Sequence, residues 1–251
     1  MHKLILKPGR EASLKRRHPW VFAGAAARMP EVSAGDTVEV TSSSGEFLAL
    51  AACNPRSQIV GRAWSFERCG IDAAFFGERL RRAAALRERL LPGVQAVRIV
   101  HAESDGLPGV VLDRYGDTCV IQLSSAGAMR WRGSIVEAIA DTLHPGTLVE
   151  RSDADVLKLE GLEPVVQLLA GAPPRAPLEI EEAGLRYGLD VLAGHKTGFY
   201  LDQRTNRARL RALANGARVL DCFCYSGGFT LNALAGGASQ VTSVDSSGAA
   251  L

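Results

Sequence analysis

The residues best suited to chemistry gather in two segments of the C-terminal third of the chain. The first is a run of polar and aromatic side chains, Gly-His-Lys-Thr-Gly-Phe-Tyr-Leu-Asp-Gln-Arg, at residues 194–204. A loop with a purely structural role rarely combines lysine, tyrosine, aspartate, glutamine and arginine between a strand and a helix. We therefore interpret this run as part of a binding site, in which His195 fixes the loop by a hydrogen bond rather than acting as an acid or base.

The second segment, Asp-Cys-Phe-Cys-Tyr-Ser-Gly-Gly-Phe at residues 221–229, follows a predicted strand and precedes a predicted helix. Its glycines allow backbone amides to approach a ligand, and the helix N-terminus adds partial positive charge. Open α/β sheets bind their ligands at such carboxyl ends of strands. The loop lacks the G-x-G-x-x-G pattern of dinucleotide-binding proteins, which disfavours a nicotinamide-dependent oxidoreductase.

Two carboxylates indicate the chemistry of the ligand. Asp221, at the strand end that opens the loop, suits a ligand with an ammonium group. Asp245, at the end of the next predicted strand, can accept hydrogen bonds from both hydroxyls of a ribose. An amino group together with a ribose points to S-adenosylmethionine as the cofactor.

The five cysteines have neither the density of a secreted disulfide scaffold nor the spacing of a zinc site. We therefore predict a reducing, cytoplasmic location and no metal. Cys222 and Cys224 are interpreted as small buried residues at a strand end rather than as nucleophiles. A structural role is also predicted for the remaining three, Cys53, Cys69 and Cys119.

The two loops must be positioned by a β-α-β unit. A buried strand beginning at residues 219–220, a helix at 229–235 and a second strand at 240–244 form this unit, preceded by a hairpin (178–180 and 185–191) and by a helix from Asp202 to Asn215-Gly216. Two strands and one crossover cannot bury both faces of a parallel sheet, so the unit looks incomplete where the sequence stops at Leu251.

The elements further upstream predict two more domains. Short strands at 4–6, 36–40, 47–52 and 59–64 indicate a small β-barrel. Asp72 begins a helix that Pro92-Gly93 ends, and strands at 110–115 and 118–124, a helix ending at 145–146, and strands at 147–151 and 155–160 follow. Residues 171–177, rich in proline, form a linker. The predicted fold class is multidomain α/β and α+β, with domains at 1–70, 71–177 and 178–251.

Composition agrees with an ordinary globular protein. The chain has 251 residues, of which 47% are hydrophobic and 22% charged, and a formal net charge of +2. This balance excludes collagen, coiled coil and general disorder, and no apolar run approaches the ~20 residues of a membrane span. The basic N-terminus has no apolar segment behind it, which excludes a secretory signal peptide. The first twenty residues nevertheless hold six basic and one acidic side chain, a stripe that suits RNA phosphates or forms a solvated tail.

Together, the segments 194–204 and 221–229 and the strand end at Asp245 closely resemble the bacterial 23S ribosomal RNA large-subunit methyltransferase I family. The resemblance extends upstream. Gly9 to Phe22 resembles the family's N-terminal PUA-type RNA-binding barrel, and Glu103–Gly109 and Glu150–Asp153 resemble its central α+β domain. The C-terminal part resembles the start of a class I, Rossmann-like methyltransferase sheet.

The resemblance implies an enzyme that uses S-adenosylmethionine to methylate carbon 5 of a cytosine in 23S ribosomal RNA, on naked RNA or on the assembling large subunit. It places the catalytic cysteine beyond Leu251, so we expect no catalytic residue here and no activity from this chain alone. The implied cofactor-binding residues are Lys196, Tyr200, Gln203, Arg204, Asp221, Phe223, Tyr225, Ser226, Gly227 and Asp245. The candidate RNA-binding residues are Arg10, Lys15, Arg16, Arg17 and Trp20.

Two alternatives remain open for the function. One is a methyltransferase that acts on another RNA base or position. The other is a non-catalytic RNA-binding fragment. The oligomeric state is also left open, and we expect no membrane partner.

Overall fold

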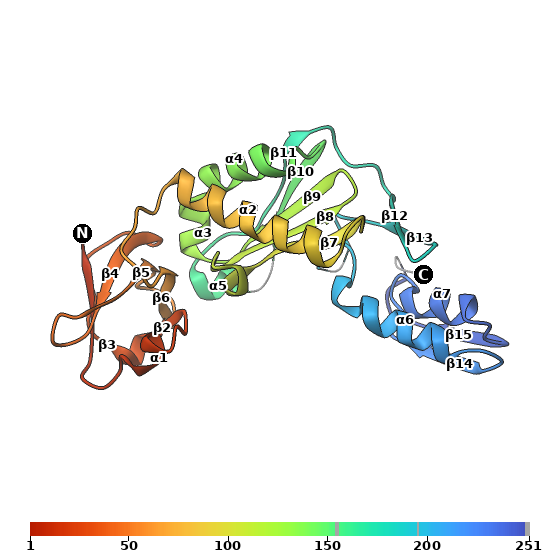
Figure 1. The fold of residues 1–251 in the computed structure, drawn as a ribbon, viewed down its shortest axis with the longest axis horizontal. Coiled ribbons are helices and arrows are strands. Elements are labelled where there is room, and N and C mark those ends of the chain that lie inside the picture. Colours follow the sequence, from red (N-terminus) through yellow and green to blue (C-terminus); the bar gives the residue numbers. More distant parts are fainter. Residues whose placement is uncertain (154–155, 195, 249–251) are drawn as a thin grey trace. The chain divides into compact units, whose positions relative to one another are not determined.

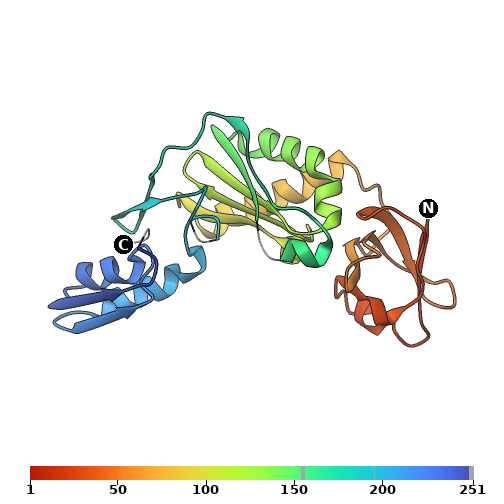
Figure 2. The ribbon, with the colours of Figure 1, turned by 180° about the vertical axis from the view of Figure 1, so that it is seen from behind.

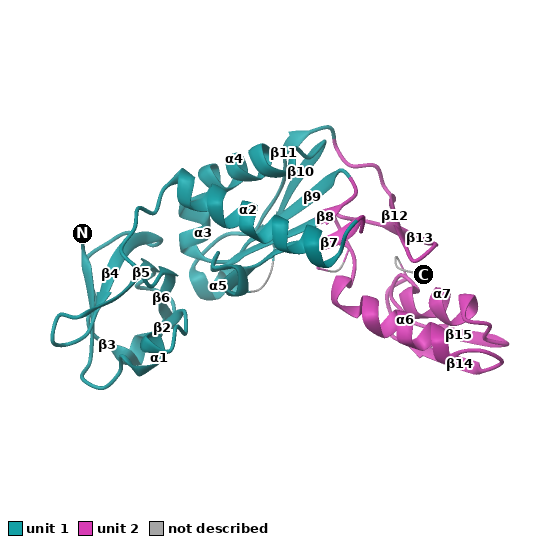
Figure 3. Ribbon diagram, viewed as in Figure 1, with its two compact units in different colours: residues 1–92, 98–113, 117–172 teal, residues 93–97, 114–116, 173–251 magenta. Residues whose placement is uncertain are grey.

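The computed structural model describes residues 1–153, 156–194 and 196–248. The chain divides into two compact units (Figure 3). Unit 1 holds residues 1–92, 98–113 and 117–172, and unit 2 holds residues 93–97, 114–116 and 173–251. In the described part of the chain, no helix is long and apolar enough to cross a membrane.

The N-terminal part of unit 1 is a six-stranded sheet in the order β2-β6-β5-β4-β1-β3. Its elements are β1 (Lys3–Leu6), α1 (Ala12–Lys15), β2 (Trp20–Phe22), the 3₁₀ turn η1 (Ala23–Ala25), β3 (Ala26–Arg28), β4 (Asp36–Thr41), β5 (Phe47–Cys53) and β6 (Ile59–Ser65). Alternate apolar side chains of these strands point inward and form the core, among them Leu4, Leu6, Val38, Val40 and Val60. The four predicted strands are confirmed, whereas α1, β2 and β3 are too short to leave a periodic signal.

The middle of the chain is a five-stranded sheet in the order β11-β10-β9-β8-β7, with two long helices on one side of it (Figures 1 and 2). Its strands are β7 (Ala96–His101), β8 (Val110–Tyr115), β9 (Thr118–Leu123), β10 (Thr147–Ser152) and β11 (Val165–Gly171). Its helices are α2 (Ala73–Leu90), η2 (Ala102–Asp105), α3 (Ala126–Arg130), α4 (Arg132–Leu143) and α5 (Val156–Glu160). Asp72 caps α2 as predicted, since its Oδ1 accepts the amide of Phe75 at 3.0 Å.

The predicted strand at 155–160 is wrong. Residues 156–160 form the helix α5, and the last strand of the sheet is β11 instead; residue 155 lies outside the described residues. A strand would place Leu157 and Glu160, which are three residues apart, on opposite faces, whereas a helical turn buries both. Glu160 then reaches the barrel, where it accepts hydrogen bonds from Asn54 and Ser57. Strand β7 was not predicted either.

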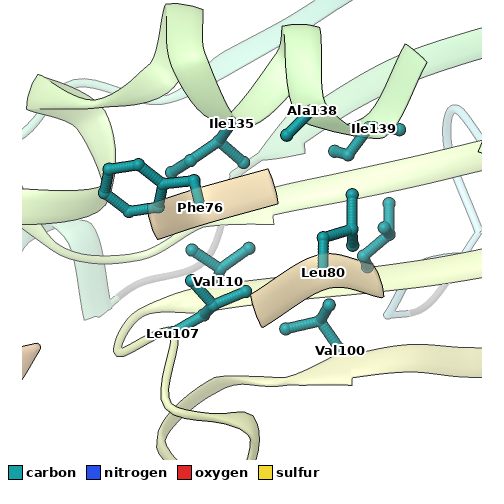
Figure 4. Close-up of a pocket in the computed structure, with 9 residues that line it drawn as sticks. Phe76, Leu80, Val100, Leu107, Val110, Ile135, Ala138 and Ile139 are labelled. Atoms are coloured by element: carbon teal, nitrogen blue, oxygen red, sulfur yellow. The ribbon is translucent and has the colours of Figure 1, made fainter. Parts of the chain in front are cut away.

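A small cavity lies between the two long helices and the sheet (Figure 4). Its volume is about 10 Å³, near the least that holds one water molecule. The lining is apolar and consists of Phe76, Leu80, Val100, Leu107, Val110, Leu112, Ile135, Ala138 and Ile139. Because a water there would find no polar partner, we interpret the cavity as a packing gap and not as a ligand site.

Unit 2 contains a hairpin and a β-α-β unit, as predicted. Its elements are β12 (Leu178–Glu182), β13 (Leu185–Leu189), η3 (Leu201–Gln203), α6 (Arg204–Leu213), β14 (Arg218–Cys222), α7 (Gly228–Ala235) and β15 (Gln240–Val244). Strands β14 and β15 pair in parallel. The prediction of a buried strand at 219–220 is wrong, since Leu220 is 64% exposed. The side chain of Asp221 reaches Thr230 of α7, whereas alternate residues on β14 face away from the helix and stay exposed.

Candidate functional site

The loop between β14 and α7 has an unusual backbone that Asp245 fixes in place. Phe223 and Tyr225 both have positive φ, 61° and 47°, which is uncommon for residues with large side chains. The amide of Tyr225 donates to Oδ2 of Asp245 at 2.7 Å, and the amide of Cys224 donates to the carbonyl of Val244 at 3.1 Å. The end of β15 therefore holds the loop in its left-handed conformation.

Aromatic rings face this loop from residues 196–203. The rings of Tyr200 and Tyr225 meet edge to face, with centroids 5.5 Å apart. The hydroxyl of Tyr225 donates to the carbonyl of Gly198 at 3.4 Å, and Nζ of Lys196 lies 5.6 Å from the centroid of the Tyr200 ring. The two segments singled out in the sequence thus form opposite walls of one site.

The space between these walls is a pocket of about 440 Å³, a volume within the range of small-molecule and cofactor sites. It combines five aromatic residues with a few charged groups. The lining residues are Lys196, Phe199, Tyr200, Asp202, Gln203, Arg207, Phe223, Cys224, Tyr225, Ser226, Gly228, Phe229, Asp245 and Ser246.

The pocket brings together most of the predicted cofactor-binding residues, namely Lys196, Tyr200, Gln203, Phe223, Tyr225, Ser226 and Asp245. The other three lie outside its lining. Arg204 donates to Glu182 at 3.0 Å and to the carbonyl of Ala96. Asp221 accepts from the Thr230 hydroxyl at 2.6 Å, and Gly227 precedes α7 in a left-handed conformation. His195 lies outside the described residues.

Arg207 is the main residue of the pocket that the sequence analysis missed. It is 2% exposed, and its guanidinium donates to both carboxylate oxygens of Glu182 at 2.7 and 2.9 Å. Burial by itself would raise the pKa of Glu182, but the hydrogen bonds and charges of Arg207 and Arg204 lower it. The sequence holds only a weak signal for this pair. Arg207 lies three residues after Arg204 on a helix, and Glu182 is an acidic residue in the hairpin.

The cysteine in the pocket is poorly suited to nucleophilic attack. Cys224 is buried, and burial raises the pKa of its thiol, with further increases from the charges of Asp221 and Asp245. The reactive form of a cysteine is the thiolate, so a raised pKa keeps Cys224 protonated at neutral pH. This supports the structural role expected for Cys224. The prediction that Cys222 is also buried is wrong, because Cys222 ends β14 on its exposed side. Among the described residues, no group of three or more histidines, cysteines and acidic residues could hold a metal ion.

The candidate RNA-binding residues lie on the barrel, where several already have partners. Lys15 pairs with Glu46 at 2.7 Å, and Arg17 lies 3.7 Å from Glu67. Nε1 of Trp20 donates to Glu103 at 2.7 Å, and the guanidinium of Arg62 lies over the Trp20 ring at 5.4 Å. Arg10 and Arg16 are exposed, and so is the ring of Phe22 on the same strand as Trp20, at 51%.

Comparison with known proteins agrees with this architecture. Residues 4–66 match the family model of a PUA-like domain, and residues 162–251 match that of an S-adenosylmethionine-dependent methyltransferase. Two solved structures have the same fold. "A putative sam-dependent methyltransferase from Streptococcus mutans" has a TM-score of 0.86 at 24% identity, covering 100% of this chain and 65% of that one. "SMU.776, a putative methyltransferase complexed with SAH" has a TM-score of 0.87 at 24% identity, with coverage of 100% and 64%.

The chain therefore has an N-terminal PUA-like domain followed by the fold of S-adenosylmethionine-dependent methyltransferases. Among curated proteins, the chain is 48% identical to the ribosomal RNA large subunit methyltransferase I of Shewanella denitrificans, over 99% of this chain and 64% of that protein. The resemblance predicted from the motifs is thus confirmed. The chain spans just under two thirds of the length of such relatives.

Proposed function

We propose that the pocket of unit 2 binds S-adenosylmethionine and that the protein methylates carbon 5 of a cytosine in 23S ribosomal RNA, in the cytoplasm. The observation that carries the proposal is the pocket itself, in which the loop at 223–229 and the aromatic segment at 196–203 enclose about 440 Å³ beside Asp245. The names of the curated relatives support ribosomal RNA as the substrate.

The residues present fit this cofactor. The Asp245 carboxylate lines the pocket, where the amides of Tyr225 and Ser247 fix its orientation, and a carboxylate is a suitable acceptor for the hydroxyls of a ribose. Lys196 and the first turn of α7 supply positive charge for a carboxylate. The faces of Tyr200 and Tyr225 suit a cationic group. The cofactor supplies a methyl group on a positively charged sulfur.

The remaining parts of the chain fit a role in holding RNA. The barrel presents exposed arginines, Arg10 and Arg16, and the exposed ring of Phe22, side chains suited to phosphates and unpaired bases. We propose that these residues orient ribosomal RNA, either naked or in the assembling large subunit. The alternative of a non-catalytic RNA-binding role for this chain alone is favoured by the burial of Cys224, the cysteine of the pocket, which makes its thiol a poor nucleophile.

Two measurements test the proposal. Calorimetry with S-adenosylhomocysteine should show saturable, one-to-one binding to this chain, and absence of binding would contradict the cofactor assignment. Transfer of a tritiated methyl group to unmodified 23S ribosomal RNA should stay at background with this chain alone. Incorporation that is lost in Cys222→Ser or Cys224→Ser would show that one of these thiols is the nucleophile.

A further inference from the structure

The buried side chain of Arg207 contacts both walls of the pocket. Its Nη1 donates to the carbonyl of Tyr200 at 2.9 Å, and its guanidinium lies 4.5 Å from the centroid of the Phe199 ring. Its aliphatic part lies against the opposite wall at Gly228. A Cβ added to Gly228 would be only 3.1 Å from Cδ of Arg207. One buried side chain therefore contacts both the 199–203 segment and the start of α7.

Glu182 holds this side chain from the far side. The pair is bidentate, with Nε and Nη2 of Arg207 donating to the two carboxylate oxygens, and it anchors α6 to the hairpin β12–β13. Such planar, two-point contacts restrict orientation as well as distance. The guanidinium thus lies in a set position between the hairpin, the Tyr200 carbonyl and α7.

We propose that Arg207 is a positioning residue that sets the separation of the two pocket walls, and with it the affinity for the nucleoside part of the cofactor. This inference rests on the proposed binding of S-adenosylmethionine. Arg207 is not expected to bind the carboxylate of the cofactor directly, because its guanidinium is held by a two-point contact with Glu182 and three of its five N–H groups have partners within the chain.

The chain offers a matched control on the same helix. Arg211 lies one turn after Arg207 and donates to the carbonyl of Ala183, the neighbour of Glu182, at 2.9 Å, but it is outside the pocket lining. Arg207→Lys and Arg211→Lys both keep the charge and remove a guanidinium that contacts the same hairpin. Only Arg207→Lys removes the contacts with the pocket walls.

Two ligands separate a positioning role from direct contact. S-adenosylhomocysteine carries the amino-acid part, whereas 5′-methylthioadenosine lacks it. If Arg207 positions the walls, Arg207→Lys weakens both ligands by at least about ten-fold in calorimetry, while Arg211→Lys changes neither by more than about two-fold. A loss confined to S-adenosylhomocysteine would show direct binding of the amino acid and would overturn the inference, as would unchanged affinity for both ligands.

Hydrogen exchange without ligand tests the clamp independently of cofactor binding. Amides of residues 198–203 and 225–229 should exchange faster in Arg207→Lys than in the wild-type chain or in Arg211→Lys. Equal exchange rates in all three proteins would overturn the inference. Because no ligand is present, this outcome is distinct from a failure of the proposed function, in which the wild-type chain would bind neither ligand. Should Arg207→Lys not fold by circular dichroism, Glu182→Gln, which leaves the arginine in place but weakens its anchor, must give the same exchange pattern.

Discussion

The carboxylate of Asp245 and the backbone of Tyr225 are joined directly, since Oδ2 of Asp245 accepts the Tyr225 amide hydrogen at 2.7 Å. The residue that we propose binds the ribose thus also holds the loop between β14 and α7. The other carboxylate oxygen, Oδ1, accepts the amide of Ser247 at 2.8 Å. A ligand that binds Asp245 would therefore meet a carboxylate whose orientation is already set.

Asp245→Asn should weaken the binding of S-adenosylhomocysteine by roughly 1.5–3 kcal/mol, the usual contribution of hydrogen bonds to a charged group. The amide side chain cannot accept from both backbone amides and also serve two hydroxyls. Titration calorimetry measures the change. Asp190→Asn is the matched control, because Asp190 accepts two backbone amides, those of Leu192 and Ala193, without lining the pocket. Equal losses in the two variants would contradict the specific role of Asp245.

Replacing Lys15, Arg16 and Arg17 together by alanine should reduce the salt dependence of RNA binding. Each phosphate contact with a single strand contributes about 0.7 to the slope of log affinity against log salt, so the slope should fall by at most about 2. The expected change is smaller than that limit, because Lys15 and Arg17 already have acidic neighbours. A filter-binding series on ribosomal RNA fragments measures the slope.

The control for this experiment removes the same charge elsewhere in unit 1. Alanine at three exposed arginines of α2, Arg81, Arg82 and Arg89, should leave the slope nearly unchanged. If both triple variants lower the slope equally, the barrel is not the RNA-binding face.

Glu160→Gln should destabilise unit 1 by about 1–3 kcal/mol at neutral pH, because it leaves buried donors with weaker partners. Glu160 is 2% exposed on its side chain, and its carboxylate accepts from Ser57 at 2.7 Å and from Arg62 at 3.0 Å. Chemical denaturation followed by tryptophan fluorescence measures the loss. Glu163→Gln, at an exposed neighbour of the same chain segment, should cost little.

The same carboxylate predicts a pH dependence. Burial alone would raise the pKa of Glu160, but hydrogen bonds from Ser57, Asn54 and Arg62 outweigh burial and lower it. A group whose pKa is lower in the folded state stabilises the fold above its unfolded pKa, so stability should fall as the pH drops below about 4.5, the ordinary value. In Glu160→Gln, the free energy of unfolding should fall less steeply with decreasing pH. An unchanged pH dependence would show that other carboxylates cause the loss of stability.

Leu80→Ala should lower the free energy of unfolding by about 2–5 kcal/mol, because it enlarges the apolar cavity under α2 that Figure 4 shows. Leu80 is buried at 3% exposure, whereas Leu86 on the same helix is 36% exposed and provides the control. Leu86→Ala should cost far less. Similar losses of unfolding free energy in the two variants would show that enlarging the cavity is not the cause of the destabilisation.

The sequence by itself determined the elements whose signals are local. Asp72 and the apolar spacing behind it place α2, and Ala183-Gly184, both at positive φ, form the turn of the hairpin β12–β13. The motifs at 194–204 and 221–229 identified the methyltransferase class, since the chemistry of a cofactor site requires particular residue types in short segments. Such information is carried by neighbours in the chain.

Only the tertiary structure decided which side chains meet. The sequence favoured Arg204 as a pocket residue, yet Arg204 binds Glu182 and Ala96, and Arg207 lines the pocket. Likewise, residues 156–160 form a helix because Glu160 finds partners more than a hundred positions earlier in the chain, in Asn54 and Ser57. Local propensities differ by fractions of a kcal/mol per residue, whereas a buried carboxylate without partners costs several, so the distant contacts prevail.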